Sequence, residues 1–115
     1  MSRSGLSDAL FTDLYQITMA QAYWQNGVTG EATFDLFFRQ FPPNRAYYVL
    51  AGLEDVLDYL QAFSFGERDL TALDAMGIFD RGFLDFLAKV RFTGQVHAML
   101  EGTLLFANEP AMKVT

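Results

Sequence analysis

The chain has 115 residues, of which 51% are hydrophobic and 19% charged, so it can form one core but is short of polar residues to cover its surface. Its net charge of −6, without any run of Lys or Arg, argues against nucleic acid or an anionic membrane as a partner, and no apolar run is long enough to span a membrane. The lack of cysteine excludes disulfides, thiolate zinc sites and a cysteine nucleophile, and it fits a cytoplasmic protein.

The N-terminal part of the sequence predicts a short leader followed by a helix. Residues 1–9 are polar and are expected to be a mobile leader, and residues 10–115 are expected to form the domain. Thr12 is the expected N-cap, although a start nearer Ser7 stays open, and Asn26-Gly27 ends the helix. Apolar residues recur at helical spacing at Leu10, Leu14, Ile17, Ala20 and Trp24.

The start of this helix combines a carboxylate with a phenol. Asp13 complements the exposed N–H groups of a first turn, and a helix start attracts anions. Tyr15 therefore lies where a flat, negatively charged ring can stack. A packing role for Tyr15 is the alternative, because Tyr15, Met19 and Tyr23 form a second stripe that would bury the helix on more than one side.

The remaining pattern alternates irregularly between strands and helices. Residues 31–40 alternate in polarity and predict a strand that is at least half-buried. After it we expect a strand over residues 47–50, helices over residues 52–63, 66–77 and 80–90, and strands near residues 95–100, 104–106 and 112–114. This order is not a regular βαβ alternation, so the sequence predicts an α+β fold.

Charged residues of the predicted strand are candidates for binding an anion. Asp35 and Arg39 share one face, but they are about 13 Å apart in an extended strand and cannot touch each other. Each can instead meet a partner on a neighbouring strand. A structural ion pair is one interpretation, and an anionic substrate held by Arg39 at a subunit boundary is the other.

Two other groups of polar residues are better explained as structural or solvent-exposed than as catalytic or metal-binding. His97 is the only histidine, and no Ser, Asp or Glu is placed by the sequence to orient its ring, so it is interpreted as a structural or surface residue. The sequence contains no glycine-rich loop that would cradle a phosphate. Acidic residues on the predicted second helix lack a glycine-containing loop and are interpreted as a solvated face rather than a metal site: Glu54, Asp55 and Asp58.

Several runs of this sequence, in order, resemble the nicotinate phosphoribosyltransferases. The most specific is Thr-Asp-Leu-Tyr-Gln-Ile-Thr-Met at residues 12–19, followed about twenty residues later by Phe-Phe-Arg at residues 37–39. The likeness also covers Ala22-Tyr23-Trp24, residues 32–36, Ala51-Gly52-Leu53, Glu101-Gly102-Thr103-Leu104 and Glu109-Pro110. It therefore extends over nearly the whole chain.

The resemblance implies an N-terminal α+β domain of a type II phosphoribosyltransferase, with the catalytic α/β barrel absent from this chain. Such enzymes form nicotinate mononucleotide from nicotinate and phosphoribosyl pyrophosphate in NAD salvage, with ATP hydrolysis and magnesium. They are homodimers whose active site lies at the subunit boundary. By this resemblance Tyr15 contacts nicotinate, Asp13 and Arg39 are further substrate-binding candidates, and no catalytic residue or metal ligand lies in this segment.

Two alternatives remain open from the sequence. One is a non-catalytic binding or dimerisation module, and the other is the N-terminal domain of a related nicotinamide or quinolinate phosphoribosyltransferase. The last residues, Lys113-Val114-Thr115, look like the middle of a strand, which indicates a fragment or a truncated gene product. By the resemblance, a segment of the enzyme that lacks the barrel is expected to be inactive alone. The apolar composition likewise predicts that part of the surface is covered by another domain or subunit, with a Phe-rich core as the alternative.

Overall fold

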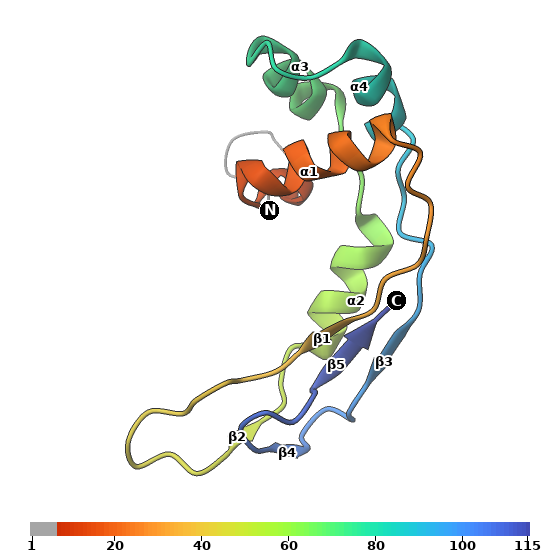
Figure 1. Cartoon of the computed structure of the whole chain (residues 1–115). Helices are drawn as coiled ribbons and strands as arrows, with labels where there is room; N and C mark the ends of the chain where they lie inside the picture. The colour runs from red at the N-terminus through yellow and green to blue at the C-terminus, as the bar shows by residue number, and fades with distance from the viewer. Residues whose placement is uncertain (1–6) are drawn as a thin grey trace. The chain divides into compact units, whose positions relative to one another are not determined.

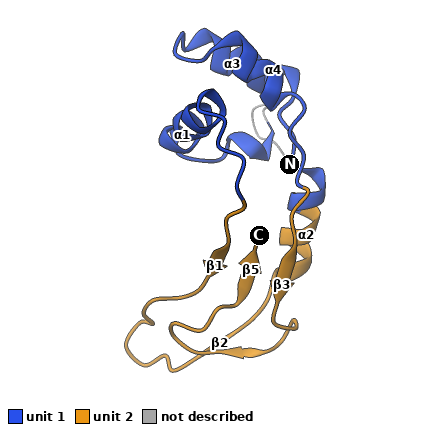
Figure 2. Cartoon of the chain, turned by 45° about the vertical axis from the view of Figure 1, so that its right-hand side comes forward, with its two compact units in different colours: residues 1–30, 59–92 blue, residues 31–58, 93–115 orange. Residues whose placement is uncertain are grey.

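Helices and short strands follow one another irregularly along the chain, which confirms the predicted α+β class (Figure 1). The structure is a computed structural model that describes residues 7–115. The chain divides into two units, each made from two stretches of sequence (Figure 2). Unit 1 comprises residues up to Gly30 together with Tyr59–Phe92, and unit 2 comprises Glu31–Asp58 and Thr93–Thr115. None of the described helices is long and apolar enough to cross a membrane.

Ordered structure in unit 1 begins ahead of the predicted boundary at residue 10. A 3-10 helix, η1, spans Asp8–Leu10, and its Ala9 is buried. The backbone N–H of Ser7 donates a hydrogen bond of 2.7 Å to the carboxylate of Asp69. Residues 1–6 of the predicted leader lie outside the described residues, and residues 7–9 belong to the folded part of unit 1.

The first long helix, α1, spans Leu14–Gln25, and its N-cap is Asp13. The prediction of Thr12 as N-cap was therefore wrong. The amide of Thr12 donates to the carbonyl of Leu10, so the 3-10 turn holds Thr12 outside the helix. The predicted end of the helix is confirmed, since Asn26 is the C-cap and Gly27 takes the left-handed conformation at φ 65°.

The core of unit 1 lies between α1, α3 (Glu67–Ala75) and α4 (Arg81–Leu87). Its central side chain is Phe83, which is fully buried and lies 5.9 Å, centroid to centroid, from the rings of both Trp24 and Phe79. The buried cluster consists of Ile17, Leu73, Phe79, Phe83, Leu84 and Leu87. The second stripe of α1 does not join this core, because Tyr15, Met19 and Tyr23 are all exposed, so the expectation of a helix buried on more than one side was wrong within this chain.

Unit 2 contains five strands of two or three residues, in two small antiparallel sheets. One sheet has the order β1-β5-β3, made of Phe34–Leu36, Met112–Val114 and Val96–Ala98. The other pairs β2 (Tyr48–Val49) with β4 (Leu104–Leu105). All the predicted strands exist: β5 has the predicted bounds, and the other four are shorter than their hydrophobic patterns.

The first strand shows why pattern and strand differ. The predicted strand over residues 31–40 is reduced to Phe34–Leu36, and all three residues are exposed, so the expectation of half-burial was wrong. Beyond Leu36 the segment of the chain that faces β1 contains Pro110, which has no N–H to donate. It also contains Asn108, which takes the left-handed conformation at φ 64°. The amide of Asn108 still donates to the carbonyl of Phe38, but the regular ladder has ended.

The helix α2 (Leu53–Ala62) begins in unit 2, close to the predicted position. Its first amides are bound by a side chain from far along the sequence. The Glu101 carboxylate accepts hydrogen bonds from the backbone N–H groups of Gly52, at 2.7 Å, and Leu53, at 3.1 Å. Glu101 therefore acts as a cap for α2 that joins two sequence runs noted above, residues 51–53 and 101–104.

Candidate functional site

The start of α1 places two of the three predicted site residues within one turn. Asp13 is the N-cap, with extended backbone and no hydrogen bond from its side chain to the helix, and Tyr15 lies in the first turn. The Tyr15 side chain is 56% exposed, and its hydroxyl accepts a hydrogen bond of 3.1 Å from the side chain of Gln16. Tyr15 therefore presents its ring to the surroundings of unit 1, as a stacking residue requires and a core residue does not.

The third predicted site residue, Arg39, belongs to unit 2 and is exposed. Within residues 7–115 the ion pair found joins Arg81 and Asp74 at 3.9 Å, so the Arg39 guanidinium has no carboxylate partner among the described residues. Asp35 lies opposite Lys113 in the sheet, on β1 next to β5. Arg39 therefore does not form an ion pair with Asp35, and its charge is free to bind an anion.

The structure places His97 on the surface, as the sequence predicted. It is exposed on β3 and lies opposite Lys113, while Asp35 lies opposite the same lysine from β1, so the three side chains form one polar row across the sheet. Among residues 7–115 no three His, Asp or Glu side chains lie close enough together to hold a metal ion.

An apolar groove of about 410 Å³ borders the start of α1. Thr12, Gln16 and Ile17 line it, whereas Tyr15 does not. None of its lining residues is charged: Ala9, Phe11, Thr12, Gln16, Ile17, Ala20, Tyr59, Phe63, Phe65, Phe86, Leu87 and Val90. The groove therefore offers contact area for an apolar group but no cation for an anionic ligand.

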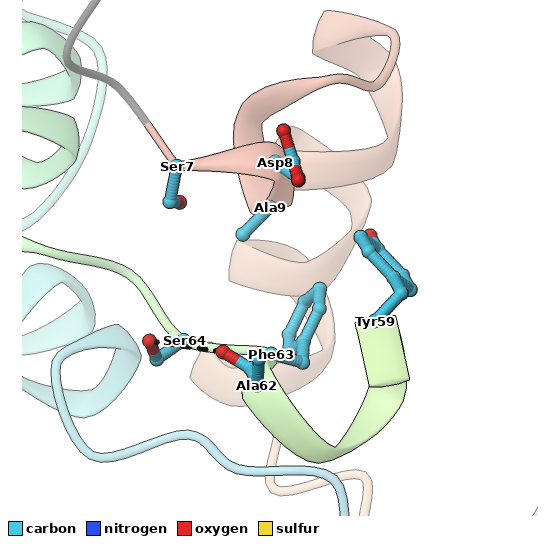
Figure 3. Close-up of a pocket in the computed structure, with 7 residues that line it drawn as sticks. All are labelled: Ser7, Asp8, Ala9, Tyr59, Ala62, Phe63 and Ser64. Carbon is cyan, nitrogen blue, oxygen red and sulfur yellow. Dashed lines mark hydrogen bonds between the residues drawn. The ribbon is translucent and has the colours of Figure 1, made fainter. Parts of the chain in front are cut away.

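A smaller cavity of about 230 Å³ lies between η1 and the residues around the end of α2 (Figure 3). Figure 3 shows the Tyr59 and Phe63 rings at its border and the Ser64 hydroxyl bonded to the carbonyl of Ala62. Burial and then the carboxylate of Asp8 raise the pKa of the Tyr59 phenol, which keeps it a neutral hydrogen-bond donor. This cavity has hydroxyls and a carboxylate but no cation, so it does not fit an anionic substrate.

Two carboxylates that the sequence analysis missed turn out to organise the backbone. Asp69 is 1% exposed and accepts N–H groups from Ser7, at 2.7 Å, and Gly66, at 2.6 Å. Glu101 does the same for the start of α2. The only sequence signal for Asp69 was its place three residues after Gly66, at the start of a helix, and nothing in the sequence pointed to its contact with Ser7.

A family model and individual known proteins that match this chain carry the same name. The family model of the nicotinate phosphoribosyltransferase N-terminal domain matches residues 10–115. The chain is 55% identical over 106 residues to nicotinate phosphoribosyltransferase pncB2 of Mycobacterium tuberculosis, a match that covers 92% of the chain and 23% of that protein. It is 45% identical over 108 residues to nicotinate phosphoribosyltransferase of Bacillus subtilis, covering 92% of the chain and 22% of that protein.

A solved structure supports the same relation. The chain matches the crystal structure of human nicotinic acid phosphoribosyltransferase with a TM-score of 0.77 and 36% sequence identity, over 90% of this chain and 21% of that one. The chain thus spans less than a quarter of the length of these relatives. By its sequence and its fold, this chain belongs to the nicotinate phosphoribosyltransferase family and corresponds to the N-terminal domain of that family.

Proposed function

We propose that this chain supplies one wall of the nicotinate pocket in an enzyme that forms nicotinate mononucleotide from nicotinate and phosphoribosyl pyrophosphate, as part of NAD salvage. The relatives support the activity by their names, and they are 55% and 45% identical to this chain over 106 and 108 residues. The observation that carries the proposal is the exposure of Tyr15. A large aromatic side chain in the first turn of α1 is 56% exposed, although the core of unit 1 lies directly beneath the same helix.

The proposed contact is a stack between the Tyr15 phenol and the pyridine ring of nicotinate. An aromatic pair in offset or edge geometry stabilises a complex by about 0.5–1.5 kcal/mol beyond the area it buries. Asp13 has the same charge as the nicotinate carboxylate, so it would orient polar groups around the ring rather than bind that carboxylate. Arg39, in unit 2, is a separate candidate for binding an anionic substrate, because it is an exposed guanidinium that no described carboxylate neutralises.

The remaining chemistry belongs to parts of the enzyme outside these residues. Among residues 7–115 no three acidic or His side chains form a group that could hold a metal ion, which supports binding of magnesium by the larger part of the full-length protein. Most of the contacts to ATP would also come from that part. We further propose that this protein is cytoplasmic and acts as a homodimer whose active site lies at the subunit boundary. The many exposed apolar side chains, such as those of Phe11, Tyr15 and Phe34, support a covering partner.

The test is the variant Tyr15→Ala in the full-length enzyme. Loss of stacking and of buried ring area should raise the KM for nicotinate about tenfold, since 1.4 kcal/mol corresponds to a factor of ten. The melting temperature should stay near that of the parent enzyme because Tyr15 does not pack in the core. Tyr15→Phe should keep most of the affinity, because it retains the ring.

The matched control is Tyr23→Ala, which removes a tyrosine of similar exposure, 50%, from the same helix. It should leave the KM for nicotinate unchanged. A Tyr15→Ala enzyme that melts early and keeps the parent KM would identify Tyr15 as a packing residue and refute the proposed contact.

A further inference from the structure

One stretch of unit 2 differs in charge from the rest of this acidic chain. From Leu36 to Leu53 there is no Asp or Glu, whereas the same stretch contains Arg39 and Arg45. The chain as a whole carries a net charge of −6. A positive segment of this kind concentrates favourable potential for an anion, because no carboxylate within the segment offsets the two guanidinium groups.

Arg45 lines an open pocket of about 530 Å³ in unit 2. The other lining residues are Asn44, Ala46, Tyr47, Tyr48 and Val49. The pocket therefore combines one guanidinium with the amide of Asn44 and with tyrosine side chains that have both ring faces and hydroxyl groups. Its volume falls in the range of sites that hold small molecules.

The backbone around this pocket is held in a defined turn. The amide of Arg45 donates to the carbonyl of Pro42 at 3.1 Å, and Asn44 takes the left-handed conformation at φ 70°. Pro42 and Pro43 restrict the chain before the turn. On the other side, Tyr48 lies at 4.4 Å and 5.0 Å, ring centroid to centroid, from Phe41 and Phe38. These contacts fix the position of the segment that carries Arg45 before any ligand arrives.

The carboxylates on either side of the strand that pairs with β2 already accept hydrogen bonds from backbone amides. Two carboxylates flank β4, the strand that pairs with β2. Glu101 binds the amides of Gly52 and Leu53, and Glu109 accepts the amide of Phe106 at 3.1 Å. No ion pair of Arg45 occurs within residues 7–115.

We propose that the pocket at Arg45 binds a phosphate group. Arg45 would supply a two-pronged guanidinium contact to the phosphate oxygens, and the hydroxyl of Tyr47 and the amide of Asn44 would supply further donors. The inference rests on the proposed function, in which two substrates carry such groups: phosphoribosyl pyrophosphate and ATP. It adds a phosphate-binding residue, Arg45, to the residues that the proposed function already names.

The experiment measures binding of inorganic pyrophosphate to the full-length protein by titration calorimetry. Arg45→Ala should weaken pyrophosphate binding about tenfold, the usual scale for one lost charge-assisted contact. Arg45→Lys should recover part of the affinity, since it keeps the charge but loses the planar fork. The matched control is Arg68→Ala, an exposed arginine of unit 1, which should leave the affinity unchanged.

Steady-state kinetics identify the source of the phosphate and separate this inference from the nicotinate contact. A rise in the KM for phosphoribosyl pyrophosphate alone would assign the pocket to that substrate, and a rise in the KM for ATP alone would assign it to the nucleotide. The KM for nicotinate should not change in either case. Unchanged pyrophosphate affinity in Arg45→Ala, or an equal loss in Arg68→Ala, would overturn the inference while leaving the Tyr15 test intact.

Discussion

The two units of this chain are stabilised in different ways. Unit 1 has a buried cluster of six apolar side chains supplied by α1, α3, α4 and the loop before α4. Unit 2 buries few residues completely, mainly Leu105, Ala111 and Met112, and its strands are two or three residues long. Unit 2 depends more on backbone pairing and on carboxylates that bind amides. Packing therefore dominates in unit 1, and hydrogen bonding dominates in unit 2.

The largest difference in stability between the two units is expected when the central core side chain of unit 1 is truncated. Phe83 is fully buried, and Phe83→Ala removes its ring from between Trp24 and Phe79. Such a substitution costs about 3–5 kcal/mol. Hydrogen exchange followed residue by residue should show faster exchange of amides in α1, α3 and α4, with less change in β3 and β5.

The matched control is Phe11→Ala, because Phe11 is the same residue type in the same unit and is 95% exposed. It should change exchange in α4 by much less. If amide exchange became equally faster in both units of the Phe83→Ala protein, the chain would unfold as one cooperative body. The two units would then not differ in stability, and the contrast between packing and hydrogen bonding would be refuted.

A smaller effect is expected from the buried carboxylate that ties η1 to α3. Burial tends to raise the pKa of Asp69, but the hydrogen bonds from Ser7 and Gly66 outweigh it and lower the pKa below the ordinary value of 3.8. Asp69→Asn exchanges an acceptor oxygen for a donor and should cost about 1–3 kcal/mol near neutral pH. Urea unfolding at several pH values measures this cost.

The pH dependence follows from the direction of the pKa change. A carboxyl whose pKa is lowered by folding stabilises the protein above its unfolded pKa, and this contribution is lost as the pH falls through the folded pKa. The difference between the parent protein and Asp69→Asn should therefore be largest near neutrality and shrink below pH 3.8. Asp85→Asn, at an exposed position of α4, is the control. A difference that is independent of pH would refute the role of the ionised carboxylate.

The helices of unit 1 were largely predictable from sequence, but the exact start of α1 was not. Periodic apolar residues and the Asn26-Gly27 cap are local signals, and they placed the body and the end of the helix correctly. The start depends on the turn at Asp8–Leu10, and that turn is held by a hydrogen bond from Ser7 to Asp69, 62 residues away. A contact of that range leaves no local pattern.

For the candidate site, the sequence predicted the place of Tyr15 on α1 but not what surrounds its side chain. Periodicity placed Tyr15 on a second apolar stripe of α1, yet it could not show whether this chain or another covers the stripe. In the structure Tyr15, Met19 and Tyr23 remain exposed. Similarly, alternation predicted a strand around Phe34, but the strand length depends on Pro110 and Asn108 in the opposite segment. Burial and register are set by distant residues.

The smallest expected effect comes from a substitution that weakens the hydrogen bonds of Glu101 in unit 2. Glu101→Gln keeps one acceptor but loses the charge that binds the amides of Gly52 and Leu53, so the start of α2 should lose about 1 kcal/mol, the usual value of a helix cap. Exchange of the Gly52 and Leu53 amides should become faster, whereas Glu54→Gln, on the exposed first turn of the same helix, should leave both nearly unchanged. If Glu101→Gln left these two amides protected, backbone pairing alone would hold the start of α2, because the amide of Gly102 donates to Leu50 and that of Leu50 to Thr103. The carboxylate would then be dispensable, and unit 2 would depend on its strands rather than on its caps.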